Sequence, residues 1–107
     1  MVVEYKGYKI EGRDDFEIQE VSDSLMLFMF NPKYFDITKE QLEDFERKVL
    51  RETNAAFTLV TTELIRGIIT LIINPTVAHY YTKELVIDAI ITFIFDHRID
   101  DDYEPFN

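Results

Sequence analysis

Residues 61–75, TTELIRGIITLIINP, form the most apolar long segment of the chain. The polar residues in this segment recur at steps of three and four: Glu63, Arg66, Gly67, Thr70 and Asn74. At about 100° per residue these positions fall within one arc of a helix, and isoleucine and leucine fill the other sides. The spacing predicts a helix over residues 62–74 that protein surrounds on most sides. Its polar stripe predicts a seam, within the core or between two chains, made of Glu63, Arg66, Thr70 and Asn74.

A second helix of the same kind is predicted over residues 83–97, with Thr82 as its N-cap. Together with the apolar run Leu25–Phe30, these two helices carry more apolar surface than one small core readily hides. Two arrangements account for the excess. In one, a two-fold homodimer buries it through an apolar helical interface. In the other, the two helices form a hairpin that is sandwiched between a sheet and a third helix.

That third helix is predicted over residues 38–53, because Thr38 and Gln41 have the spacing of a capping box. Residues 54–62 are ambiguous. Their apolar spacing would continue the helix, whereas threonines at 58, 61 and 62 lower helix propensity. We expect a break in this segment, and a strand over Phe57–Thr61 is the competing interpretation.

Residues 2–30 predict a small antiparallel β-meander. Lys6-Gly7 is a turn signal that would place Tyr5 opposite Tyr8 and Glu4 opposite Lys9. Alternation from Phe16 onward indicates a third strand, and the run Leu25–Phe30 suits a central strand that helices cover on at least one face. The fold class is therefore predicted to be α+β, with this meander packed against a C-terminal half of three helices.

The composition limits the function classes. A chain of 107 residues predicts a single domain over 1–107, with an acidic C-terminal tail at about 98–107. There is no cysteine for a disulfide or a thiolate site, and the three glycines are too dispersed for a phosphate-binding loop. No signal peptide is recognised. No convincing membrane span is recognised either, because the best candidate segment for a span contains Glu63 and Arg66. We expect a cytoplasmic protein that is not an enzyme, binds no cofactor and does not enter a membrane.

The net charge of −10 is concentrated in two segments. Residues 11–23 hold six acids against Arg13, and residues 96–107 hold five acids against Arg98. Such patches disfavour direct nucleic-acid binding, which depends on neutralising phosphates. A basic surface on another protein is the natural partner, and simple solubilisation is the alternative.

The expected function is therefore a non-enzymatic acidic protein-binding module. By analogy, short acidic cysteine-free chains are typical of inhibitors encoded by viruses and mobile elements, which engage nucleic-acid-binding surfaces by mimicking phosphates. One alternative is the homodimeric structural or regulatory domain described above. A second is a small metal-dependent enzyme or ligand-binding domain that uses His97 and nearby acids. The predicted partner-binding residues are Asp14, Asp15, Glu17, Glu20, Asp96, Asp100, Asp101, Asp102, Tyr103 and Glu104.

Overall fold

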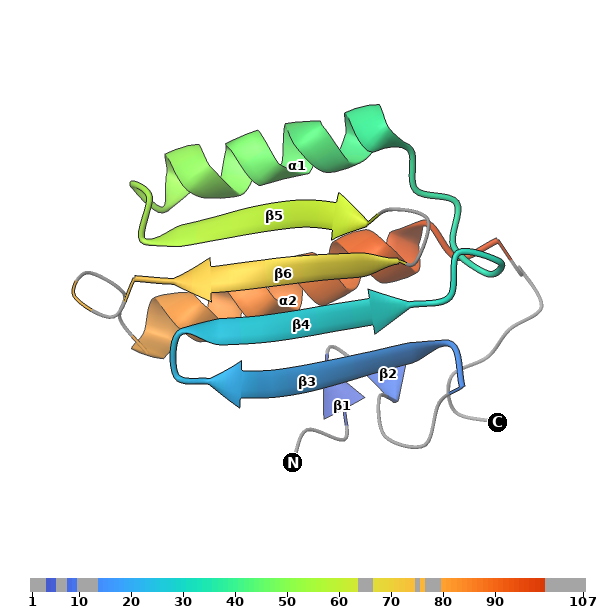
Figure 1. The fold of residues 1–107 in the computed structure, drawn as a ribbon, viewed down its shortest axis with the longest axis horizontal. Helices are drawn as coiled ribbons and strands as arrows, with labels where there is room; N and C mark the ends of the chain where they lie inside the picture. Colours follow the sequence, from blue (N-terminus) through green and yellow to red (C-terminus); the bar gives the residue numbers. More distant parts are fainter. Residues whose placement is uncertain are drawn as a thin grey trace.

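The computed structural model of the chain describes residues 4–5, 8–9, 14–63, 67–74, 76 and 80–99. These residues form an α+β fold, as predicted (Figure 1). A four-stranded sheet of antiparallel neighbours has the order β3-β4-β6-β5, and a separate ladder pairs β1 with β2. In chain order the elements are β1 (Glu4–Tyr5), β2 (Tyr8–Lys9), β3 (Phe16–Ser22), β4 (Leu25–Phe30), α1 (Lys39–Glu52), β5 (Phe57–Glu63), β6 (Ile68–Ile73) and α2 (Tyr80–Asp96).

The prediction of three helices is wrong, since the described residues contain two. The segment expected to be a helix over 62–74 instead supplies the end of β5, the turn residue Gly67 and the whole of β6. β5 begins at Phe57, so the competing strand interpretation of this region is confirmed. The last helix begins at Tyr80, which places Thr82 inside it rather than at its N-cap.

The N-terminal hairpin has the predicted register, with Glu4 opposite Lys9 and Tyr5 opposite Tyr8. It does not join β3 and β4 in one meander, because β1 and β2 form a sheet of their own. The second half of the predicted meander is a hairpin in which β3 pairs with β4. β4 is a central strand, as expected, but its other neighbour is β6.

Local capping signals define both ends of α1. Thr38 accepts a hydrogen bond from the Gln41 amide, and the Gln41 side chain accepts one from the Thr38 amide, which completes the predicted capping box. At the C-terminus, Asn54 has a φ of 52° and the Ala55 amide donates to the Leu50 carbonyl at 2.9 Å. This arrangement is a Schellman motif, which ends the helix and turns the chain into β5.

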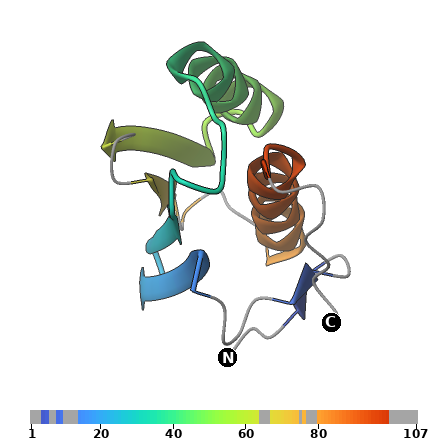
Figure 2. The ribbon, with the colours of Figure 1, turned by 90° about the vertical axis from the view of Figure 1, so that its right-hand side faces the viewer.

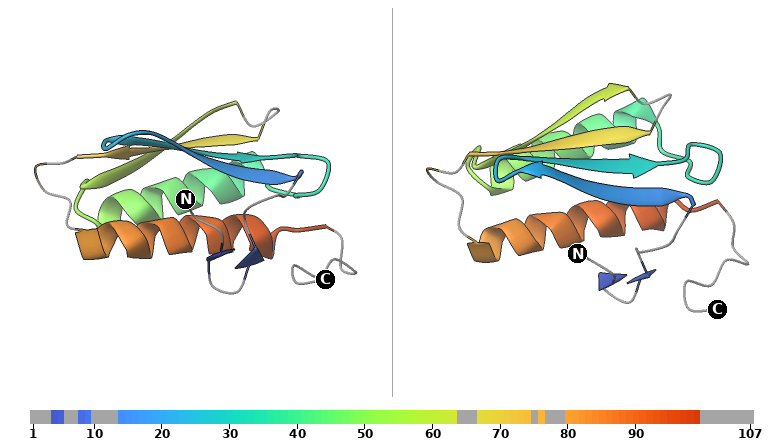
Figure 3. Two further views of the ribbon diagram at one scale, coloured as in Figure 1. Left: turned by 90° about the horizontal axis from the view of Figure 1, so that it is seen from below. Right: turned by 60° about the horizontal axis from the view of Figure 1, so that its bottom comes forward.

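Both helices lie on the same face of the four-stranded sheet (Figures 2 and 3). Alternate residues of β4 and β6 point into this layer and are buried, as the alternation of a half-covered sheet requires, whereas β3 at the edge buries only Phe16. α1 packs along β5 at one edge, and its Phe45 ring stacks on Phe93 of α2 with 4.3 Å between centroids. The sheet residues of this core are Phe16, Met26, Phe28, Phe30, Phe57, Leu59, Ile69, Leu71 and Ile73.

Gly67 allows β6 to begin directly beside the end of β4. Its φ is +66°, and its carbonyl accepts a hydrogen bond of 2.8 Å from the Phe30 amide. A Cβ atom at this position would lie 1.9 Å from the Phe30 carbonyl oxygen. Because that oxygen belongs to the backbone, a side chain could be accommodated only by moving the strand.

We therefore expect Gly67→Ala to lower the free energy of unfolding by about 3 kcal/mol or more, through backbone strain and displacement of β4 from β6. Urea denaturation followed by circular dichroism would measure the loss. Ala55→Gly is the matched control, because Ala55 also has a positive φ of 63° but lies exposed in a turn. That change should stabilise the protein by roughly 0.5 kcal/mol. A Gly67→Ala variant as stable as the wild type would contradict the steric argument.

Candidate functional site

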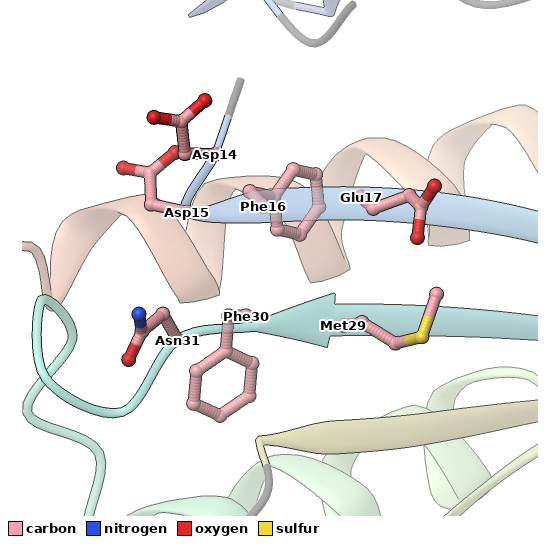
Figure 4. Close-up of a pocket in the computed structure, with 7 residues that line it drawn as sticks. All are labelled: Asp14, Asp15, Phe16, Glu17, Met29, Phe30 and Asn31. Carbon is pink, nitrogen blue, oxygen red and sulfur yellow. The ribbon is translucent and has the colours of Figure 1, made fainter. Parts of the chain in front are cut away.

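Among the acidic residues predicted within 11–23, Glu17 and Glu20 lie on β3, an edge strand of the sheet, while Asp14 and Asp15 precede it and Asp23 follows it. Asp14, Glu17, Glu20 and Asp23 are all exposed. A pocket of ≈ 360 Å³ opens where β3 begins and β4 ends, and Asp14 and Glu17 are among the residues that line it (Figure 4). Its full lining is Asp14, Asp15, Phe16, Glu17, Met29, Phe30 and Asn31.

The pocket lies at the acidic edge, and residues from both faces of the sheet line it. Glu17 and Met29 are cross-strand partners, so the carboxylate and the thioether lie side by side. Neither strand contributes a lysine or arginine here. The four strands of the sheet contain three glutamates and no basic residue.

Asp15 has a different position from its acidic neighbours. It is 7% exposed, and its carboxylate lies 3.2 Å from the guanidinium of Arg98. The Arg98 side chain is 11% exposed and also donates to the Tyr34 carbonyl at 3.2 Å. A buried carboxylate engaged in this way holds the fold together and presents no charge to a partner.

The Asp15–Arg98 pair belongs to a wider attachment of the segment after α2. Arg98 forms an isolated antiparallel bridge with Phe35 and lies over the Tyr34 and Phe35 rings at 5.0 and 5.3 Å. The Ile99 amide donates to the Tyr34 carbonyl at 2.9 Å. The loop after β4 and the segment after α2 are thus joined to Asp15, immediately before β3.

The second predicted acidic segment is described only in part. Asp96 is exposed at the last residue of α2. The predicted residues Asp100, Asp101, Asp102, Tyr103 and Glu104 lie outside the described residues.

His97, the candidate metal ligand, contacts its own helix end. Its Nδ1 atom lies 2.7 Å from the Phe93 carbonyl oxygen, a distance at which Nδ1–H donates to that oxygen. Its ring lies 4.7 Å from that of Phe93. Among the described side chains, no group of three or more histidine, cysteine, aspartate or glutamate residues could hold a metal ion.

The predicted helical seam does not exist as a stripe, because its members lie on two strands and a loop. Glu63 ends β5, Thr70 is in the middle of β6, and Asn74 follows β6. Arg66 lies outside the described residues. Thr70 instead has Leu27 and Val60 as its cross-strand neighbours.

The outer face of the sheet is a feature that the sequence analysis missed. No described helix or strand covers this face (Figure 3). Its centre consists of three cross-strand pairs between β4 and β6, which we call the open face. The pairs are Leu25 with Ile72, Leu27 with Thr70, and Met29 with Ile68. All six side chains are partly exposed, and Ile72 reaches 42%.

The run Leu25–Phe30 was expected to be covered by helices on at least one face, and its residues alternate between buried and partly exposed, so only one face is covered by the described elements. The signal that could have revealed the open face is the matching alternation of Ile68–Ile73, which a helical interpretation obscures. Fold and site together define a small α+β domain with an open-faced sheet and an acidic edge.

The chain matches no protein-family model, no curated protein and no solved structure. Within the described residues, neither helix has the length and apolar character needed to cross a bilayer.

Because Asp15 is buried against a cation, Asp15→Asn should lower the free energy of unfolding by about 3 kcal/mol, through the buried charge left on Arg98. Asp14→Asn is the matched control, since the Asp14 carboxylate is exposed. This change should lower the free energy of unfolding by less than about 0.5 kcal/mol. Thermal and urea unfolding of the two variants would measure the difference. Equal stabilities would contradict a structural role for Asp15.

Proposed function

We propose that this protein is a non-enzymatic module that binds a basic surface of another protein through the acidic edge of β3. The observation that supports this proposal is the unbalanced charge of that edge. Asp14, Glu17, Glu20 and Asp23 are exposed, and none of them forms an ion pair within the described part of the chain. The surface residues of α1 differ, because Lys39 pairs with Glu43 and Arg47 pairs with Asp44.

The spacing of the carboxylates suits recognition of an extended basic surface. Glu17 and Glu20 lie in β3, roughly 10 Å apart, whereas Asp14 precedes the strand and Asp23 lies in the turn that follows it. Glu17 and Glu20 pair with Met29 and Met26, which lie on opposite faces of the sheet, so the charge belongs to the edge as a whole. Such a line of carboxylates would attract lysine and arginine side chains that otherwise contact phosphates, which is the basis for nucleic-acid mimicry. Asp15 is not part of this surface, since Arg98 neutralises it.

A bulge between Glu20 and Ser22 supports the use of this edge for charge rather than for strand addition. Bulges and charged side chains are the devices by which exposed strands avoid pairing with another strand. A partner is therefore expected to contact the carboxylates and not to extend the sheet.

The test requires a partner captured from the native host by cross-linking and then purified. Its association rate with the wild-type protein should fall steeply between about 50 and 500 mM NaCl, since screening shortens the reach of the acidic edge. The double variant Glu17→Gln/Glu20→Gln should associate several-fold more slowly at low salt while its dissociation rate changes little.

The matched control is Glu40→Gln/Glu52→Gln, which removes the same charge from exposed positions on α1. α1 lies beside β5, at the opposite edge of the sheet from β3 (Figure 1). Equal slowing by the two double variants would assign the effect to net charge alone. Binding that is independent of salt would reject the electrostatic proposal.

A further inference from the structure

We draw no further inference here: the strongest candidate, the pocket where β3 begins and β4 ends, belongs to the acidic edge already described, and the buried carboxylate among its lining residues, that of Asp15, is already paired with Arg98.

Discussion

The pairing of β4 with β6 is the constraint on which the rest of the fold depends. It joins two local hairpins that are far apart in the chain, and it requires α1 to cross from one to the other. At the end of this pairing the Phe30 amide donates a hydrogen bond to the Gly67 carbonyl. A glycine is needed at position 67 because the two strands approach closely there. Since α1 and α2 share one face of the resulting sheet, no described helix or strand covers the other face.

Signals confined to a few neighbouring residues were predicted correctly from the sequence. The Thr38–Gln41 capping box and the pairing of Tyr5 with Tyr8 depend only on local spacing. The segment 61–75 was misassigned because its polar residues match a helical period, although its β-branched residues and Gly67 favour strands and a turn. The content of β-branched residues alone does not distinguish a strand from a helix. α2 also contains four isoleucines, and it is a helix with no glycine or proline inside it.

The candidate site was predictable to the extent that it depends on composition. The cluster of acids at 11–23 was visible in the sequence, and Asp14, Glu17 and Glu20 prove to be exposed. The burial of Asp15 was not predictable, because it follows from the return of Arg98 to the start of β3 after α2 has crossed the sheet. The open face was missed for a related reason. Which side of Leu25–Phe30 is covered depends on where the helices pack, and no residue in the run specifies it.

The strand order has a consequence for the kinetics of folding. β6 lies between β4 and β5, so it cannot be inserted as a separate strand after the other strands of the sheet have taken their places. We expect the β5–β6 hairpin to form first and to dock as a unit on β4, where Met26 must find Leu71. Such a non-local search sets the rate at which a sheet forms. Substitutions in the β4–β6 ladder should therefore slow refolding, whereas substitutions in the C-terminal turn of α1 should mainly accelerate unfolding in stopped-flow measurements.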